Sequence, residues 1–349
     1  MAFACVFASP DRGGCSGGTV AAAARTVRGL DLPWRRRMAE VRGDGGRGWA
    51  ALLPGDAPER RVRATVVRLA RRGVREVSLS PRFGVPGPGL RLWLAACLRA
   101  ALGLAARGGS PARALVVGAD TVAGRLALAW LAARVRFVGV GDAPGFRHFR
   151  EAERLLVGLG VAVNWEPVED PGPAWEGDLV VWACGSRRLG RPVRAPVWLA
   201  AHWPWGDVPP GAPAGGSGGE AEVGRPAGCA GGEREAGCPG ARAVVVDALL
   251  GGPGLKGIPS WWWKEWGWPE GFLPAGGLEA ALALPARSDG LERLWRAVRD
   301  RGWSLAGAVV AGGSGAGTER GHSSGNRGEA WRVVWLTGMG SGHIIGDAY

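Results

Sequence analysis

The stretch ALVVGADTVAGRLALAW, residues 114–130, decides the fold that this sequence predicts. An apolar run leads into Gly118, a short polar segment follows, and from Val122 the apolar residues recur at helical spacing. A strand, a glycine turn and a helix in this order suit a dinucleotide, because backbone N–H groups and the positive helix end face its pyrophosphate. The stretch therefore predicts a strand–turn–helix unit with Gly118 in the turn and Gly124 in the first helical turn.

Strand-like and helix-like patterns alternate on the C-terminal side of this unit. Apolar strand patterns recur at 135–140, 161–165, 178–183 and 241–249, and a helical pattern covers 145–159. Regular alternation of this kind implies parallel βαβ units. We therefore expect an α/β protein in which residues 111–311 form a Rossmann-like parallel-sheet domain. Residues 206–242 are too poor in large apolar groups to pack, so we expect a long disordered insertion there.

The rest of the chain divides into three parts. Residues 1–48 show little periodicity and are expected to be a poorly ordered N-terminal segment. Residues 49–110 contain two strand patterns and two helical patterns, which predict a small α/β domain. Residues 312–349 are expected to form a flexible segment and a tail strand. The predicted architecture is therefore a small N-terminal domain followed by the Rossmann-like domain.

The basic composition gives little support to a nucleic-acid partner. The 349 residues carry a net charge of +12, and Lys256 and Lys264 are the only lysines among 43 basic residues. The arginines are spread along the whole chain, whereas a nucleic-acid binder gathers its basic residues on one element with aromatic partners. The high arginine content is therefore typical of proteins encoded by a GC-rich genome.

The cysteines and the apolar runs indicate the compartment. The six cysteines include no CxxC pair and no histidine at metal-ligand spacing, so we expect free thiols and no metal. The N-terminus lacks the pattern of a signal peptide, and no apolar run reaches the ~18–20 residues of a membrane span. A cytoplasmic protein without a membrane segment is the resulting prediction.

An acidic residue should end the second strand of a dinucleotide site, where it accepts the ribose hydroxyl groups. Asp142 lies 24 residues beyond Gly118 and is predicted to take this role, which favours NAD. Arginines beside His148 favour NADP, so the choice between NAD and NADP stays open. Asp120 replaces the middle glycine of the usual fingerprint, and its carboxylate would repel a pyrophosphate. Either Asp120 turns aside to cap the helix, or the turn no longer binds the ligand.

The segment GADTVAGR resembles the loop G-[RA]-S-x-x-V-G-[KR]-P of the methylenetetrahydrofolate dehydrogenase/cyclohydrolase family. DLVVWACG and AVVVDAL are similar to strands of that family, of shikimate dehydrogenases and of glutamyl-tRNA reductases. The resemblance implies a small catalytic domain, a Rossmann domain, and a returning helix near GFLPAGGLEAALAL. It also implies a phosphate loop and a strand end under the nicotinamide. The phosphate-loop positions are Gly118, Thr121, Gly124 and Arg125; the strand-end positions are Ala183, Cys184 and Gly185.

The sequence departs from these families at the catalytic residues. Its N-terminal half contains no lysine, and Arg82 stands where the shikimate enzymes have one. Arginine stays protonated at neutral pH and is a poor acid/base group, so the catalytic residues are unknown. Cys184 is a candidate thiol beside the nicotinamide, with simple packing as the alternative. Lys256 is a candidate acid/base group at the sheet edge, with a solvated loop lysine as the alternative.

The leading functional hypothesis is an NAD(P)-dependent oxidoreductase acting on a small polar metabolite. A non-catalytic relative that senses a nucleotide or binds a partner is the alternative, because the lysine is missing and Asp120 is present. Five tryptophans between Trp261 and Trp268 indicate a lid over the core or the interface of a homodimer, or the wall of a substrate pocket.

Overall fold

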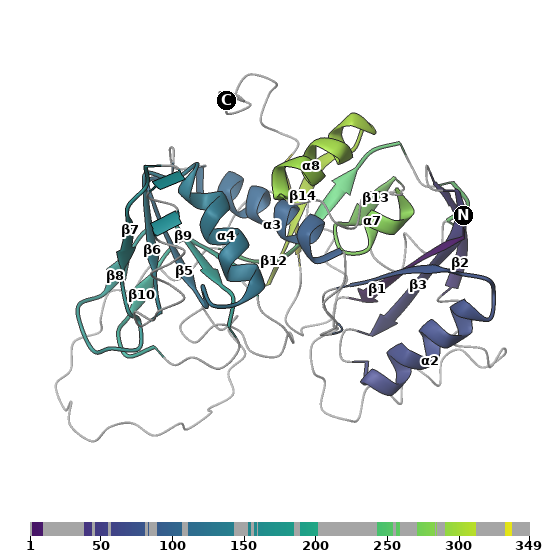
Figure 1. Ribbon diagram of the computed structural model, residues 1–349, viewed down its shortest axis with the longest axis horizontal. Helices are drawn as coiled ribbons and strands as arrows, with labels where there is room; N and C mark the ends of the chain where they lie inside the picture. The colour runs from purple at the N-terminus through teal and green to yellow at the C-terminus, as the bar shows by residue number, and fades with distance from the viewer. Residues whose placement is uncertain are drawn as a thin grey trace.

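The computed structural model describes most of the chain outside three long segments. The described residues are 2–9, 38–43, 46–54, 57–80, 83, 89–106, 111–142, 153–154, 157–158, 160–184, 189–201, 243–253, 256–258, 271–282, 284, 290–311 and 332–336. Most of the expected helix over 145–159, the whole 206–242 insertion and the Trp261–Trp268 cluster lie outside these residues. The described part is a mixed α/β protein with two sheets rich in parallel strands (Figure 1).

The small sheet begins with the first residues of the chain. Its order is β2 (Met38–Gly43), β3 (Gly46–Pro54), β1 (Phe3–Ser9) and β4 (Glu76–Leu79). β1 is an inner strand that pairs in parallel with β3 and β4, while β2 and β3 form an antiparallel pair. The expected poor order of residues 1–48 is therefore wrong for β1 and β2. β1 pairs with strands that lie far along the chain, β2 forms a hairpin with the neighbouring β3, and both strands bury apolar side chains.

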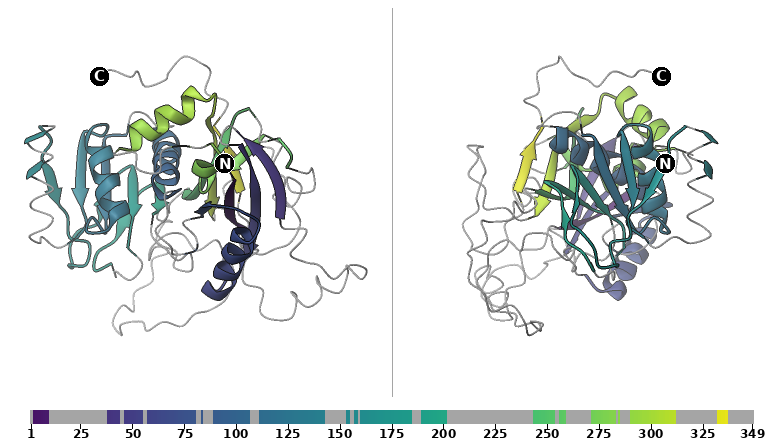
Figure 2. Two further views of the ribbon diagram at one scale, coloured as in Figure 1. Left: turned by 45° about the vertical axis from the view of Figure 1, so that its right-hand side comes forward. Right: turned by 90° about the vertical axis from the view of Figure 1, so that its left-hand side faces the viewer.

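One face of the small sheet is covered by α2 (Glu59–Ala70). Val62, Thr65 and Leu69 recur at helical spacing and are buried on this face, against side chains such as Val6 and Leu53. After α2 the chain turns back toward β4 through Gly73, which has the positive φ of +81° that glycine adopts without strain. In Figures 1 and 2 the small sheet and α2 lie at one end of the molecule, away from β6.

The large sheet contains six parallel strands in succession. Their spatial order is β7 (Val163–Trp165), β6 (Phe137–Val140), β5 (Arg113–Val117), β9 (Leu179–Trp182), β11 (Val197–Ala200) and β12 (Ala243–Gly251). Antiparallel strands follow on the β12 side. These are β14 (Ser304–Ala311) and β15 (Arg332–Trp335) along the sheet, with β13 (Phe272–Pro274) on the far end of β12. A separate parallel pair joins β8 (Trp175–Glu176) to β10 (Val193–Arg194).

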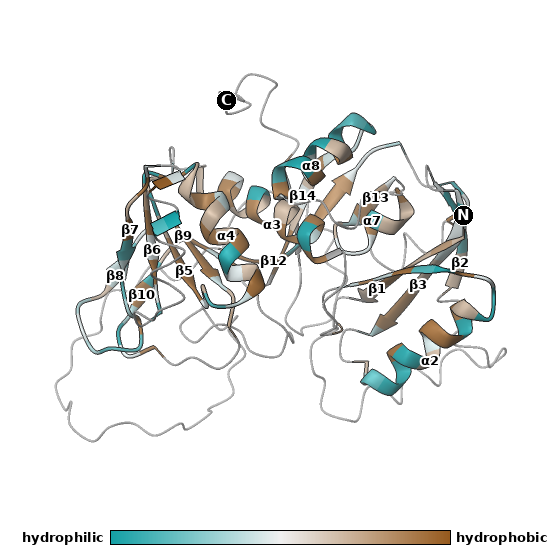
Figure 3. Ribbon diagram, viewed as in Figure 1, coloured by the Kyte–Doolittle hydropathy of each residue, from teal (hydrophilic) through white to brown (hydrophobic). Residues whose placement is uncertain are grey.

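Three helices pack together on the large sheet. α3 (Gly89–Ala105) lies on β11, β12 and β14, and α4 (Val122–Ala132) lies on β5 and β6. α8 (Leu291–Asp300) packs on α3 and carries hydrophilic residues on its outer side, whereas the strands beneath are hydrophobic (Figure 3). We expected α3 to belong to the small 49–110 domain, but it covers the large sheet. An unbroken buried run such as Leu92–Leu98 fits this place, because α3 has neighbours on every side.

The two sheets share one hydrophobic core. The second face of the small sheet presents Phe3, Cys5 and Phe7, which join the buried cluster that contains α3 and the large sheet. α7 (Leu278–Ala281) contacts β1, β4 and α3 and so lies between the two parts. The two regions are therefore joined by continuous apolar packing as well as by the chain.

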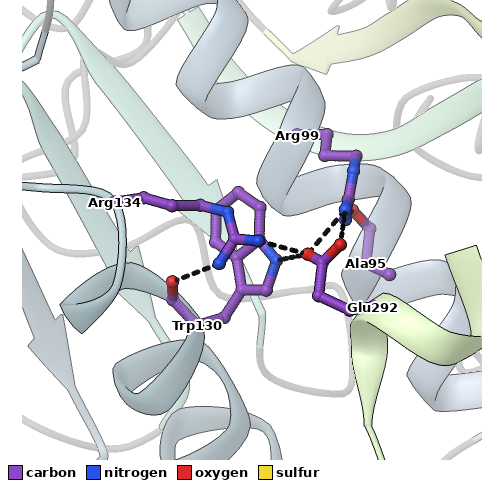
Figure 4. A network of polar contacts seen from close by, with 5 residues as sticks. All are labelled: Ala95, Arg99, Trp130, Arg134 and Glu292. Carbon is purple, nitrogen blue, oxygen red and sulfur yellow. Dashed lines mark hydrogen bonds and ion pairs between the residues drawn. The ribbon is translucent and has the colours of Figure 1, made fainter. Parts of the chain in front are cut away.

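A carboxylate on α8 ties the three helices together. Both oxygens of Glu292 accept from Arg99 Nη2, at 2.6 and 2.7 Å, and one oxygen also accepts from Trp130 Nε1 and from Arg134 Nη2 (Figure 4). Both guanidinium groups lie over the Trp130 ring, with centroid distances of 5.3 Å for Arg99 and 4.3 Å for Arg134. Burial alone would raise the pKa of Glu292, but the Arg99 charge, the hydrogen bonds and Arg134 together hold it below its ordinary value.

Glu292→Gln should destabilise the fold by about 1–2 kcal/mol, because both arginines lose their ion pair and the half-exposed carboxylate is partly screened by water. A lowered pKa means that this stability is present above the unfolded value near 4.5 and is lost as the pH falls through the lower folded value. Urea unfolding at neutral pH and at acidic pH measures both effects. The control Glu59→Gln breaks only the exposed pair with Arg63 and should cost less than about 0.5 kcal/mol.

Candidate functional site

The glycine turn after β5 brings α4 very close to the strand. Gly118 has a φ of +86°, and a Cβ atom there would lie 2.9 Å from the backbone nitrogen of Cys184. A Cβ atom on Gly124 would lie 2.1 Å from the Gly118 carbonyl oxygen. Any side chain at either position would collide with backbone, so both predicted glycines are required by the packing of the turn.

The helix after the turn is capped by Thr121. Its Oγ1 accepts from the Gly124 N–H at 2.9 Å and donates to the Gly118 carbonyl oxygen at 2.8 Å. Of the two alternatives for Asp120, the structure excludes the helix cap, because the residue after it takes that position. The other alternative, a turn that does not bind the dinucleotide, stays open. The cap uses one of the first-turn N–H groups, and helical geometry leaves those of Val122 and Ala123 without acceptors inside the helix.

Asp142 lies directly beneath the turn. Its Oδ1 accepts from the Gly118 N–H at 2.8 Å, and its Oδ2 accepts from the Ala119 N–H at 2.5 Å. The residue is completely buried. The structure thus brings Asp142 to the predicted site, but with backbone N–H groups as partners. The ribose role predicted for it would require the carboxylate to become accessible.

Two charged residues, Asp120 and Arg125, lie beside the turn. The Asp120 residue is exposed, and its carbonyl oxygen accepts from Arg125 Nη1 at 2.6 Å. Arg125 is therefore held against the turn, where the resemblance places a phosphate contact. The Asp120 carboxylate and the Arg125 guanidinium have opposite effects on a bound anion, so neither charge alone decides whether the turn attracts one.

Cys184 follows β9 and lies against Gly118. The Cβ atom that Gly118 lacks would lie 2.9 Å from the Cys184 Cβ atom, so the two strand ends touch. The thiol is half-buried and forms no disulfide within the described residues. Ala183 is buried beside it, and Gly185 lies outside the described residues. The structure therefore brings Cys184 to the glycine turn, as a thiol at the junction of two parallel strands.

Lys256 lies at a different place, on the small sheet. Its N–H donates to the Arg42 carbonyl oxygen at 3.0 Å, and its own carbonyl accepts from the Arg42 N–H at 2.6 Å. This bridge attaches the loop after β12 to β2, and the Lys256 residue is exposed. Its backbone therefore joins the two parts of the protein, while its exposed side chain matches the solvated alternative.

The sequence patterns do not single out two acidic residues that lie inside apolar segments. Asp247 interrupts β12 at a bulge, and its charge adds to burial in raising the pKa of Cys97. Glu279 lies in the first turn of α7 and is 2% exposed, and neither of its carboxyl oxygens has a hydrogen-bond partner among the described residues. Burial raises the pKa of Glu279 to about 8, although Arg91 acts in the opposite direction. The signal that the sequence offers for each of these two residues is a single acidic residue within an apolar run.

The described residues contain no group of three or more His, Cys, Asp or Glu side chains that could hold a metal ion. No helix in the described ranges combines the length and apolar character needed to cross a membrane. A search against models of known protein families finds none that matches this chain, and no curated protein matches it. The candidate site therefore stands on its own geometry: a glycine turn, a helix N-terminus, a buried carboxylate and a thiol.

Proposed function

We propose that the protein binds a nicotinamide dinucleotide at the turn around Gly118 and acts as an NAD(P)-dependent oxidoreductase on a small polar metabolite. One observation carries the proposal. Numbered along the chain, the six parallel strands have the spatial order 3-2-1-4-5-6, which is the order of Rossmann dinucleotide-binding domains. The order reverses between β5 and β9, where Gly118 directly follows β5 and Cys184 is the second residue after β9. Ligands of open α/β sheets bind at such a switch point.

The turn fits the phosphates of a dinucleotide in its backbone geometry. The positive φ of Gly118 and the close approach of Gly124 leave no side chain between the strand and α4. The Val122 and Ala123 N–H groups and the positive end of α4 would hold the pyrophosphate. Arg125 would supply the countercharge, and Cys184 would lie beside the nicotinamide. A bound nicotinamide would donate a hydride in its reduced form or accept one in its oxidised form, while the chain would position it.

A non-catalytic protein that senses a nucleotide or binds a partner is the second candidate. It is favoured by Asp142, because this carboxylate already accepts from the Gly118 and Ala119 N–H groups. The buried Asp142 carboxylate thus occupies backbone N–H donors that a bound phosphate or ribose would otherwise use. A nucleotide sensor would share the site with the oxidoreductase and differ from it in turnover, whereas a partner-binding protein would bind no nucleotide there.

Asp120→Asn is expected to strengthen NADH binding about threefold to tenfold at low salt, because it removes one negative charge beside the pyrophosphate. Quenching of the 19 tryptophans and sensitised NADH emission measure the affinity. Asp142→Ala is a poorer test, since it leaves two buried N–H groups unpaired and destabilises the turn itself. Asp300→Asn, an equal charge change at the end of α8, is the control and should leave the affinity unchanged.

Three outcomes separate the candidates. Saturable binding that Asp120→Asn strengthens supports the site, and oxidation of NADH in a screen of small oxo compounds then supports the oxidoreductase. Binding of another nucleotide without turnover supports the second candidate. If the folded protein binds neither NADH nor NADPH, the dinucleotide proposal is wrong.

A further inference from the structure

The outer side of α2 carries a concentrated positive charge. Six arginines are exposed on α2 and the turn that ends it, and we call them the α2 arginine face: Arg60, Arg61, Arg63, Arg68, Arg71 and Arg72. Glu59, which pairs with Arg63, is the only acidic residue of the helix. The spread of arginines along the whole chain gives little support to a nucleic-acid partner. These six nevertheless lie within residues 60–72, on the exposed half of one helix and the turn that ends it.

The direction of this face follows from the helical period. Val62, Thr65 and Leu69 point at the small sheet, so Arg60 and Arg71 lie on the opposite side with Ala64 and Val67 between them. Eleven residues separate the two arginines, which corresponds to about 16 Å along the helix. Arg63 lies beside this line, and the neighbouring flank of the helix carries Arg61, Arg68 and Arg72, the last of which packs over the Trp49 ring. The charges therefore extend along the helix in two lines, and an elongated charge matches an extended polyanion better than a single anionic group. The face points away from the large sheet (Figures 1 and 2).

We infer that the α2 arginine face is a docking surface for the phosphate backbone of double-stranded DNA. Guanidinium groups bind phosphate oxygens in pairs of hydrogen bonds, and each strand of a duplex carries one phosphate for about every 3.4 Å along the duplex axis. The α2 arginine face thus spans several phosphates. Its exposed positions are arginine, alanine and valine with one glutamate, so the binding is sequence-independent and comes from the backbone.

Other partners fit this surface less well. A single-stranded nucleic acid needs exposed aromatic rings for its bases, but Trp49 lies under Arg72 at 4.3 Å, and Val67 is the one large apolar side chain exposed on α2. A membrane-surface helix needs its apolar side free for lipid, whereas that side of α2 is buried on the sheet. A second copy of the chain would bring like charges together, given the net charge of +12.

The test compares two double variants of the full chain that remove equal charge. Arg60→Gln with Arg71→Gln changes the α2 arginine face, and Arg293→Gln with Arg296→Gln changes two exposed arginines of α8. Binding to a labelled duplex of about 20 base pairs is measured by fluorescence anisotropy over a series of salt concentrations. We expect the α2 variant to bind at least about tenfold more weakly, with a salt dependence shallower by about two counterions. The α8 variant should stay within about twofold of the wild type.

Several results would overturn the inference. Equal losses in both variants would mean that net charge alone attracts the duplex. Tighter binding to a single strand of the same length, or to vesicles with anionic lipid, would assign the face to that partner instead. NADH affinity should be the same in both variants and the wild type, so this result is independent of the proposed dinucleotide site.

Discussion

Glu279→Gln is expected to make the protein more stable at alkaline pH, although it removes a charged residue. The carboxyl group is buried without a hydrogen-bond partner among the described residues, so its ionised form is strongly disfavoured in the folded state. Its folded pKa of about 8 lies above the unfolded value near 4.5. The native state therefore binds the extra proton between these values, and wild-type stability falls as the pH rises from about 4.5 to 8.

The loss in the wild type should reach roughly 5 kcal/mol at most, or about 10 °C in melting temperature, and it should be complete above pH ~8. Thermal melts at pH ~5 and pH ~9 measure it. The glutamine variant should match the wild type at the lower pH and exceed it at the higher one, because its amide stays neutral. Glu176→Gln, an exposed residue that pairs with Arg194, should leave both melting temperatures within about 1 °C. A wild type whose stability does not fall between these pH values would show that Glu279 has partners when ionised.

Gly124→Ala should have the largest destabilising effect of any single methyl group added to the candidate site. The new Cβ atom would lie 2.1 Å from the Gly118 carbonyl oxygen and 2.9 Å from the Ala119 Cα atom. Both contacts are with backbone, so relief requires α4 to move away from β5. We expect a loss of at least about 3 kcal/mol in the free energy of unfolding, measured in urea.

Gly103→Ala is the matched control, since Gly103 also lies in a helix and a Cβ atom there has no neighbour within 4 Å. This change should stabilise the protein by about 0.5–1 kcal/mol, because alanine favours the helix. The two alanines therefore have opposite signs if the turn packs as described. A Gly124→Ala variant as stable as the wild type would mean that α4 does not approach the Gly118 turn this closely.

The strand–turn–helix unit could be predicted from the sequence because its signals are local. Apolar residues at strand spacing, a glycine and then helical spacing predict residues 114–130 correctly as β5, the turn and α4. Gly118 and Gly124 were chosen from the same pattern, and the packing explains both. The α/β class followed from alternation in the same way.

The parts of the fold that were predicted wrongly depend on contacts with distant parts of the chain. β1 pairs with strands more than forty residues away, so a short apolar run before a glycine-rich segment carried no sign of its place inside the small sheet. α3 was recognised as a helix, but its neighbours decide which sheet it covers. Glu279 was overlooked because its burial arises only where α7 meets the small sheet.

The sequence alone determined the class of fold, the site of the glycine turn and the proximity of Asp142, because these depend on period and on order along the chain. The tertiary structure decided what those residues contact. It gave the Asp142 carboxylate two backbone N–H partners, brought Cys184 against Gly118, and buried Glu279 where α7 meets the small sheet. Partners and burial are properties of surfaces brought together by folding, and spacing along one chain does not contain them.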